Sequence, residues 1–286
     1  MKKKAFNILC MILALMMIFF SVGWLLFTRP SNTKMIIDDV AFISTLTCDE
    51  IIELPSLGEN EPGFTCTGLT YDIKSDSFWI GNYGKISQTN EMKNPSLVQI
   101  SNDFKKIKKQ IVIKGDVDIQ GVSYDSTTDT LWYSDGKYII NCSKEGKTIS
   151  QFDLGKYEKY QPNGIVYDSQ TNTLWVLCFY NYLLNYDTNG NLIKAIQSDY
   201  IGQDHLCFMP DKKLCFSVGN DYNGEENYIA VYSPDMLTIE HAYQVQSSYS
   251  IEGICVVDSK LYIANDGYYH DAKIKKNYIA IYNYAN

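Results

Sequence analysis

The stretch Asn163 to Val176 reads N-G-I-V-Y-D-S-Q-T-N-T-L-W-V, two short apolar segments around a polar turn. The pattern recurs at Gln120 to Tyr133, Q-G-V-S-Y-D-S-T-T-D-T-L-W-Y, and at Thr67 to Ile80, T-G-L-T-Y-D-I-K-S-D-S-F-W-I. Two looser copies run from Asp204 to Phe216 and from Glu252 to Tyr262. Strand hairpins that repeat every 40 to 50 residues or so are typical of β-propellers.

The copies can be aligned on one position, which holds Gly68, Gly121, Gly164, His205 and Gly253. In the third copy the pattern predicts strands over 164–168, 173–178, 181–187 and 191–197. The last copy has room for only three strands, so we expect Thr45 to Leu54 to supply the fourth and close the ring. The sequence therefore predicts an all-β fold, a β-propeller of five blades. Six blades are the alternative, if residues 37–66 contain a further hairpin.

The repeated glycine and aromatic residues have structural explanations. Innermost strands crowd at the propeller axis, where glycine allows close backbone approach. The rings are expected to pack between neighbouring blades; they are Tyr71, Tyr124, Tyr167, Phe208, Trp79, Trp132 and Trp175. These residues indicate the fold and not the chemistry.

The chain begins with three lysines at positions 2–4, followed by an apolar run from Ala5 to Phe27. As a helix this run reaches roughly 34 Å, enough to span the ~30 Å hydrocarbon core of a bilayer. We predict a cytoplasmic basic stub at 1–4, a transmembrane anchor at 5–27, a tether at 28–38 and the propeller domain at 39–286. The positive-inside rule places the propeller outside the cytoplasm, on a single-pass protein of the cell membrane. A cleavable signal peptide is the alternative.

The part of the chain after the apolar run is acidic. From Thr28 onward all 33 acidic residues but only 22 of the 25 basic residues remain, a formal charge of −11. This charge argues against nucleic acid as a partner, because nucleic-acid sites need clustered Lys and Arg. It is compatible with cations and with neutral or positively charged ligands.

Seven cysteines follow the apolar run, without zinc-like spacing. They are Cys48, Cys66, Cys142, Cys178, Cys207, Cys215 and Cys255. Most lie in apolar strand patterns, where cysteine behaves as a small buried residue. Cys207 and Cys215 flank one short turn, so free thiols and a disulfide are both open for this pair.

A polar residue precedes the aligned position in every copy. These residues are Thr67, Gln120, Asn163, Asp204 and Glu252. They begin the innermost strands on the face where the second strands end, and the connections there carry Asn82, Asp135, Asn220, Asp221, Asn265 and Asp266. Oxygen-bearing side chains that converge at a channel mouth suit a cation such as Ca²⁺, or a polar ligand. A water-filled polar channel is the alternative.

Three connections on this face are long, at 81–95, 219–227 and 265–277. In a five-bladed ring they belong to consecutive blades, and long loops on a rigid scaffold often carry binding function. The last one holds His270 near Asp266 and Asp271. His270 is therefore a candidate ligand-binding residue, with a solvated loop histidine as the alternative. Motifs of nucleophilic catalysis and of phosphate or dinucleotide binding do not occur.

Three features resemble one group of bacterial propellers: E-G-I at Glu252 to Ile254, P-N-G-I at Pro162 to Ile165, and the repeated Y-D-x-x-x-x-x-L-W hairpin. The chain resembles the SdiA-regulated propeller family and the wider esterase-like and gluconolactonase-like propellers. The first family commonly has an N-terminal membrane segment. In the gluconolactonase-like group, Glu, Asn and Asp side chains hold a divalent cation at the channel mouth.

The resemblance implies Glu252 and Asn163 as metal ligands, with Asp204 or Asp221 as the aspartate. The sequence thus predicts a membrane-anchored, extracytoplasmic propeller that binds a ligand or partner on its loop-bearing face, with Ca²⁺ or another divalent cation at the channel mouth. Candidate ligand-binding residues are Gln120, Asn163, Asn82, Asp135, Asn265, Asp266 and His270; candidate metal ligands are Glu252, Asp204, Asn163 and Asp221.

Two alternatives to this function stay open. One is a metal-dependent esterase or lactonase, in which the cation polarises a carbonyl and an Asp acts as base. The other is a structural scaffold of the cell envelope without a small ligand.

Overall fold

The computed structural model describes residues 37–38, 40–57, 64–84, 94–115, 117–179, 182–197, 205–219, 221–233 and 238–284. The chain divides into two compact units, 1–38 and 39–286, and the strands belong to the second. The predicted membrane segment at 5–27 lies outside the described residues. Within the described residues, no helix is both long and apolar enough to span a bilayer.

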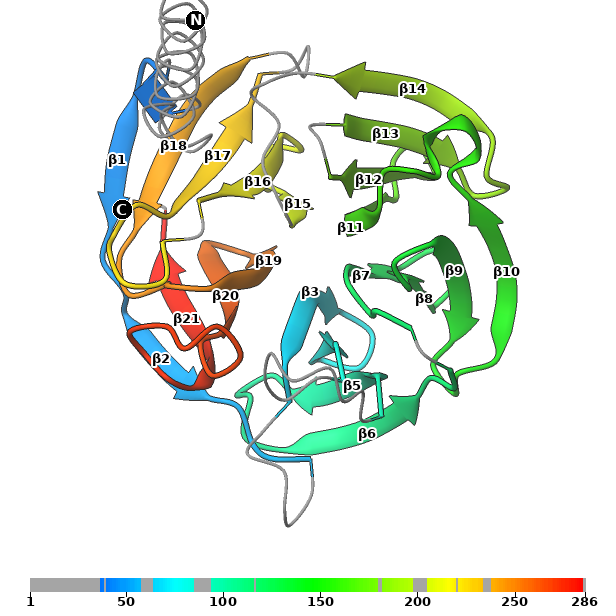
Figure 1. The fold of residues 1–286 in the computed structure, drawn as a ribbon, viewed down its shortest axis with the longest axis horizontal. Coiled ribbons are helices and arrows are strands. Elements are labelled where there is room, and N and C mark those ends of the chain that lie inside the picture. Colours follow the sequence, from blue (N-terminus) through cyan, green and yellow to red (C-terminus); the bar gives the residue numbers. More distant parts are fainter. Residues whose placement is uncertain are drawn as a thin grey trace, which may run out of the picture. The chain divides into compact units, whose positions relative to one another are not determined.

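The second unit is a β-propeller of five blades around a central axis (Figure 1). Blade one contains β3 (Cys66–Asp72), β4 (Ser77–Asn82), β5 (Ser96–Ser101) and β6 (Ile107–Val112). Blade two contains β7 (Val122–Asp125), β8 (Thr130–Ser134), β9 (Tyr138–Ser143) and β10 (Thr148–Asp153). After a short 3-10 turn at Gly155–Tyr157, blade three contains β11 (Pro162–Asp168), β12 (Thr173–Cys178), β13 (Tyr182–Asp187) and β14 (Leu192–Gln197). The five-bladed prediction is confirmed.

The last two blades incorporate the N-terminal strands. Blade four contains β15 (Leu206–Phe208), β16 (Leu214–Val218), β17 (Tyr228–Tyr232), β18 (Ile239–Val245) and, parallel to β18, β1 (Ile43–Leu46). Blade five contains β19 (Ile251–Val257), β20 (Lys260–Asp266), β21 (Asn277–Asn283) and, antiparallel to β21, β2 (Glu50–Glu53).

The predicted closing strand is thus divided between two blades. Glu50–Glu53 closes blade five, as expected, but Thr45 and Leu46 pair with blade four. The prediction of one strand from Thr45 to Leu54 is wrong in this respect. The physical reason is that the outer edge of β18 has backbone N–H and C=O groups that can pair with another strand. β1 pairs with this edge before the chain crosses to the next blade.

One hydrogen-bond plan explains the repeated hairpin. In blade two, Asp125 accepts a bond from Trp132 Nε1 at 3.4 Å, and Tyr124 OH donates to Asp129 Oδ1 at 2.7 Å. Asp129 has φ of 60°, a left-handed conformation that Asp and Asn tolerate. Blade one repeats both bonds with Asp72, Trp79, Tyr71 and Asp76. The Y-D-x-x-x-D/N-x-x-W pattern therefore encodes a turn and the anchor of its tryptophan.

The aligned glycines allow the inner strands to meet. A Cβ on Gly121 would lie 2.5 Å from Asn163 O and 2.6 Å from Ile165 N, both in blade three. A Cβ on Gly253 would lie 2.7 Å from the carbonyl carbon of Gly68, across the junction that closes the ring. The expected crowding at the axis is confirmed.

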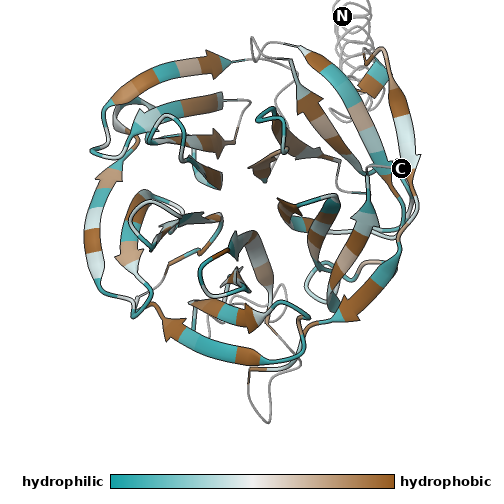
Figure 2. Cartoon of the chain, turned by 180° about the vertical axis from the view of Figure 1, so that it is seen from behind, coloured by the Kyte–Doolittle hydropathy of each residue, from teal (hydrophilic) through white to brown (hydrophobic). Residues whose placement is uncertain are grey.

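Apolar side chains fill the space between neighbouring blades. Trp79 of blade one packs with Val122 and Leu131 of blade two, and Trp132 of blade two packs with Ile165 of blade three. Figure 2 shows mainly hydrophobic strands near the axis, whereas the outermost strands alternate in hydropathy because one face meets solvent. Trp79, Trp132, Tyr124 and Tyr167 of the repeat thus belong to the core between blades, as predicted, whereas Phe208 is half-buried and lines a channel cavity.

Candidate metal and ligand site at the channel mouth

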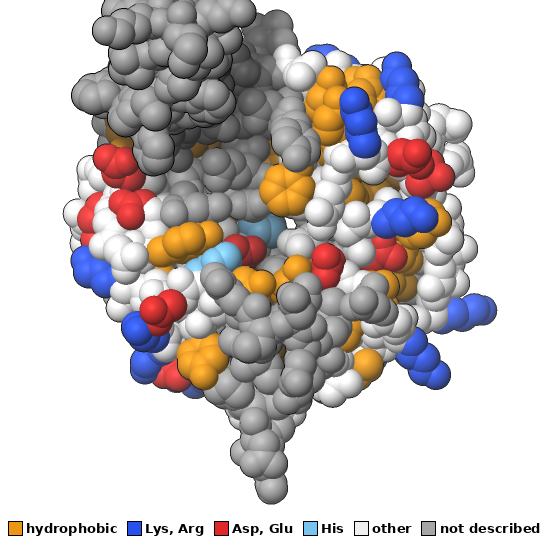
Figure 3. All heavy atoms as spheres, viewed as in Figure 1, with side chains coloured by type: hydrophobic (Ala, Val, Ile, Leu, Met, Phe, Trp, Pro, Cys, Tyr) orange, Lys and Arg blue, Asp and Glu red, His pale blue; other side chains and the backbone are white. Residues whose placement is uncertain are grey.

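One mouth of the central channel opens into a cavity of about 350 Å³. Inner strands and the segments leading into them contribute Thr65, Thr67, Asp118, Gln120, Gln161, Asn163 and Glu252, and the strand ends and loops that face them contribute Tyr83, Phe179, Tyr222, Asp266, Tyr269 and His270. Described residues from the long connections of blades one, four and five therefore lie at this mouth. In Figure 3 acidic and histidine side chains gather near the axis on the same face.

Two β-bulges position polar side chains at the mouth. The register of blade five shifts between Ile251 and Gly253, which leaves Glu252 as the extra residue. The register of blade three shifts between Pro162 and Gly164, which leaves Asn163 as the extra residue. Bulges redirect side chains and are frequent beside active sites. The residues named by the E-G and N-G motifs thus occupy equivalent bulges on different blades.

Glu252, Asp266 and His270 form a compact group of potential metal ligands, with one ligand atom from each lying within 4.8 Å of the others. His270 Nε2 lies 3.4 Å from Glu252 Oε1 and 3.5 Å from Asp266 Oδ2. The group assembles locally because β19 and β20 are paired, so the start of one strand lies beside the end of the other. His270 follows in the next loop.

His205 approaches the same group from blade four. Its side chain is 3% exposed, and Nε2 lies 3.6 Å from Glu252 Oε2, with no closer hydrogen-bond partner among the described residues. Glu252 therefore lies between two imidazoles, one near each carboxylate oxygen. The sequence identified His205 only as the residue at the aligned position of blade four. The replacement of glycine at a repeated position was the signal that could have identified it.

The charge of the site is negative. Burial by itself would raise the pKa of Glu252, but hydrogen bonds and charge interactions with His205 and His270 outweigh burial and lower it. Asp118 and Asp266 also line the cavity, and no Lys or Arg occurs among its described lining residues. The electrostatics favour a cation and disfavour an anionic ligand.

The ligand types fit a divalent cation. Carboxylate and imidazole groups together suit Zn²⁺, Mn²⁺ or Fe²⁺, whereas Ca²⁺ takes oxygen ligands. The imidazole of His270 is held by aromatic contacts: it stacks on Tyr222 with ring centroids 4.5 Å apart and meets the edge of Tyr269 at 4.9 Å. Such outer contacts fix the orientation of a ligating ring.

Of the other predicted ligand-binding residues, Gln120 lines the cavity, while Asn82, Asp135 and Asn265 do not. Asn82 Nδ2 donates to Ser96 Oγ at 3.1 Å, and Asn265 Oδ1 accepts from Ser250 N at 3.2 Å. Asp135 Oδ1 accepts from Tyr138 N at 2.6 Å. These side chains shape the connections that surround the mouth.

Of the two candidate aspartate ligands, the structure describes only Asp221. Asp221 does not line the cavity; it accepts from Gly224 N at 2.8 Å within its own loop. Asp204 lies outside the described residues, as does Asn220. Sequence reasoning did not single out Asp118, Gln161 and Phe179, which line the cavity. Asp118 and Gln161 lie three residues before the aligned glycine, the position of Thr65 in blade one, so the repeat was the signal that could have identified them.

The protein-family models that were searched do not match the chain, and no curated protein matches it. Similar solved structures include a protein of unknown function from Bacteroides caccae, at 13% identity and a TM-score of 0.48 over 72% of each chain. Virginiamycin B lyase from Staphylococcus aureus has 15% identity and a TM-score of 0.46 over 79% of this chain and 68% of that one. The Cps50 (Swd1) β-propeller domain of Myceliophteria thermophila has 10% identity and a TM-score of 0.45 over 82% and 99%. At these identities the likeness concerns the fold alone.

Proposed function

We propose that the protein binds a divalent metal ion through Glu252, Asp266 and His270, and that the surrounding cavity binds a polar ligand. The observation that carries the proposal is the convergence of these three ligand groups within 4.8 Å. The buried imidazole of His205, directed at Glu252, is a second and independent observation. Two separate blades thus supply polar groups to one point of the channel mouth.

The residues have distinct roles in this proposal. Glu252, Asp266 and His270 supply metal ligands, and His205 positions Glu252. A bound cation would supply a positive centre for an oxygen atom of the ligand. The preferred ion is Zn²⁺ or Mn²⁺ because an imidazole nitrogen belongs to the group.

The walls of the cavity indicate the class of ligand. Gln120, Gln161 and Asn163 offer amide groups, and Tyr83 and Phe179 offer aromatic surface. Amides hydrogen-bond hydroxyl groups, and no described Lys or Arg lines the cavity to pair with a phosphate or carboxylate ligand. We therefore propose an uncharged, hydroxyl-bearing ligand of a size that fits about 350 Å³.

Thermal unfolding tests the metal site. The full chain, in detergent and freed of metal by a chelator, is titrated with Zn²⁺, Mn²⁺ or Ca²⁺. We expect Zn²⁺ or Mn²⁺ at a hundredfold excess over Kd to raise Tm by about 5 °C or more. Glu252→Gln should abolish the shift. Asp135→Asn should retain it, because Asp135 lies outside the cavity and Asn still accepts the turn hydrogen bond. Equal responses of the two variants, or no response to any cation, would overturn the proposal.

A metal-dependent esterase or lactonase is the second candidate. The observation that favours it is Asp118, whose carboxylate lines the same cavity as the three grouped ligands and is a candidate for proton transfer. A screen with lactones and short esters tests this activity. Loss of turnover in Asp118→Asn with unchanged metal affinity supports the enzyme; absence of turnover in the parent protein excludes it for those substrates.

We also propose that residues 5–27 anchor the chain in the cell membrane and place the propeller outside the cytoplasm. The support is the apolar run preceded by lysines at 2–4. A protease added to intact cells should cleave the propeller, and full protection would contradict this topology. We further propose a relationship to the SdiA-regulated propellers, which the E-G-I and P-N-G-I motifs support; their Glu252 and Asn163 both line the cavity.

A further inference from the structure

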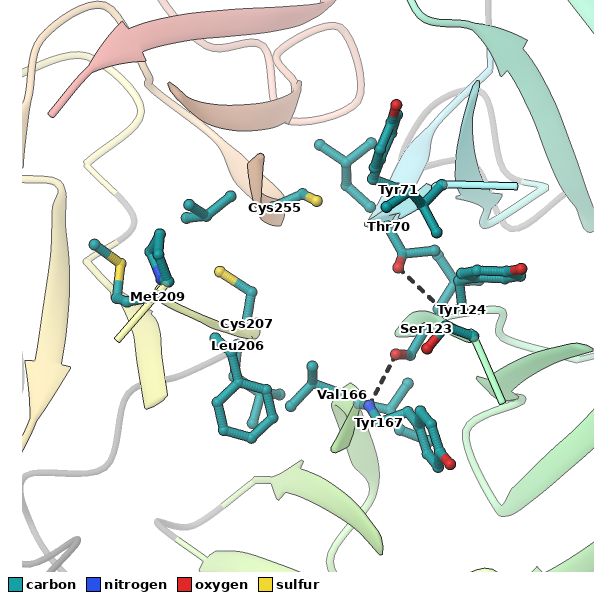
Figure 4. Close-up of a pocket in the computed structure, with 18 of the residues that line it drawn as sticks. Thr70, Tyr71, Ser123, Tyr124, Val166, Tyr167, Leu206, Cys207, Met209 and Cys255 are labelled. Atoms are coloured by element: carbon teal, nitrogen blue, oxygen red, sulfur yellow. Dashed lines mark hydrogen bonds between the residues drawn. The ribbon is translucent and has the colours of Figure 1, made fainter. Parts of the chain in front are cut away.

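The other mouth of the channel has a different chemistry. Its cavity of about 490 Å³ is lined by the inner strands of all five blades (Figure 4). Five equivalent residues, each two positions after the aligned glycine position, contribute to it: Thr70, Ser123, Val166, Cys207 and Cys255. Hydroxyl groups thus occupy this position in blades one and two, and thiols occupy it in blades four and five.

The hydroxyl groups link neighbouring blades. Thr70 Oγ1 accepts from Tyr124 N at 3.0 Å, and Ser123 Oγ accepts from Tyr167 N at 2.9 Å, as the dashed lines in Figure 4 show. Cys207 departs from this arrangement, because its sulfur atom contacts a second sulfur within its own blade. Its role is therefore different from that of Thr70 and Ser123.

Cys207 and Cys215 lie directly opposite each other on β15 and β16, and their sulfur atoms are 3.3 Å apart. Opposed residues of an antiparallel pair have Cα atoms about 4.5 to 5.5 Å apart, inside the range that a disulfide requires, roughly 4.4 to 6.8 Å. Formation of a covalent bond thus needs side-chain adjustment and no change of register.

We propose that Cys207 and Cys215 form a disulfide that holds β15 to β16 at this mouth of the channel. The oxidant is a small-molecule disulfide. Cys207, which lines the cavity, attacks it and forms a mixed disulfide with release of one small thiol. Cys215 then attacks the Cys207 sulfur and releases the second. Two protein thiols are oxidised, one small disulfide is reduced to two thiols, and the protons of the cysteines pass to the leaving groups.

The location gives the bond a structural purpose. β15 has three residues, whereas the inner strands β3, β11 and β19 have seven each. A covalent link would reinforce this short pairing, which joins only three residues of each strand. His205 lies two residues before Cys207, and its carbonyl accepts from Ser217 N at 2.9 Å. The link would therefore also fix the backbone that carries His205.

Thiol counting on the full chain tests the proposal. The protein is treated with glutathione disulfide, denatured and alkylated without reductant, and its mass is measured. We expect six of the eight cysteines to be alkylated. Trypsin cleaves at Lys212 and Lys213, between the two cysteines, so the disulfide should join two separate peptides. Alkylation of all eight cysteines would overturn the proposal.

Two variants identify the pair. In Cys207→Ser all seven remaining cysteines should react; a persistent loss of two thiols would place the disulfide elsewhere and overturn the proposal. Cys178→Ser is the matched control, because Cys178 is also buried, and it should keep the linked peptides. Oxidation should raise Tm by about 5 °C in the parent protein and not in Cys207→Ser. The mass measurement on the parent protein does not depend on the folding of either variant.

Discussion

Blades one to three share one hairpin plan, whereas blades four and five depart from it at positions that face the channel. At the aligned position the first three blades have glycine, and blade four has His205. Two residues later, blades one and two have Thr70 and Ser123, and blades four and five have cysteine. The regular blades use these positions for close packing and for bonds between blades.

The difference separates the residues that build the ring from those available for chemistry. The imidazole of His205, the grouped Glu252, Asp266 and His270, and the contacting thiols all belong to blades four and five. A residue that recurs in every blade serves the common structure, so a departure at a repeated position indicates a requirement of one blade only. Substitutions in the regular blades should therefore change mainly the stability of the ring, whereas substitutions of the departing residues should change mainly the site.

The largest effect is expected for Gly121→Val in the regular part of the ring. The new Cβ would meet backbone atoms of blade three at 2.5 Å and 2.6 Å, which cannot move without shifting a strand. We expect a loss of about 3 kcal/mol or more in the free energy of unfolding, measured by urea titration. Gly155→Val is the control, since nothing lies within 4 Å of its Cβ position and only its φ of 58° opposes the change. Equal losses would contradict the packing argument.

The second-largest effect on the free energy of unfolding is expected for the ion pair between blades one and two. Lys144 Nζ lies 3.1 Å from the buried Asp72 Oδ2. Burial acts to raise the pKa of Asp72, but the hydrogen bonds from Ser75 and Lys144 outweigh it and lower the pKa below 3.8. This contribution to stability is present above pH 3.8 and is lost as the pH falls through the lower pKa of the folded state.

Asp72→Asn should therefore reduce the free energy of unfolding by about 2 kcal/mol at pH 7, and the difference from the parent protein should shrink below pH 3.8. Denaturant titrations at several pH values measure both quantities. Asp168→Asn, in the equivalent hairpin of blade three, is the control, because the contacts of the Asp168 carboxylate are to its own turn. A pH-independent difference for Asp72→Asn would contradict the ion-pair assignment.

His205→Gly restores the repeat residue to blade four and removes one imidazole from Glu252. We expect metal affinity to fall by about tenfold, because residues that orient a ligand typically contribute at least this much. Isothermal calorimetry measures Kd, and circular dichroism checks the fold. His205→Gln can again donate to Glu252 and should recover most of the affinity. If Gly and Gln variants lose affinity equally, His205 does not act by positioning Glu252.

The smallest effect is expected for Val166→Thr in blade three. Val166 occupies the position of Thr70 and Ser123 but has no acceptor for a backbone N–H of the next blade. A hydroxyl there should raise the free energy of unfolding by about 0.5 to 1 kcal/mol, and Ser123→Ala should lower it by a similar amount. Denaturant midpoints of both variants provide the measurement. Changes of the same sign would contradict the equivalence of the positions.

The repeat by itself determines most of the fold. Its Tyr-Asp pair, its left-handed Asp or Asn and its Trp specify a hairpin through contacts within about ten residues, so the recurrence predicts the number of blades and the strands within them, whereas closure at the N-terminal strands was predicted only in part. The polar start of each inner strand likewise predicted a polar channel mouth that contains Glu252 and Asn163, and the long loop of the last blade predicted His270 there.

Only the tertiary structure decided which of these residues meet. Asn82, Asp135 and Asn265 are polar residues at or beside the ends of second strands, but their side chains bond to Ser96, Tyr138 N and Ser250 N and do not line the cavity. The approach of His205 to Glu252 depends on the placement of one blade beside the next. The contact of Cys207 with Cys215 and the division of the N-terminal strand depend on strand register and on a free sheet edge. Local patterns determine strands and turns, whereas distances across blades follow from how the ring closes.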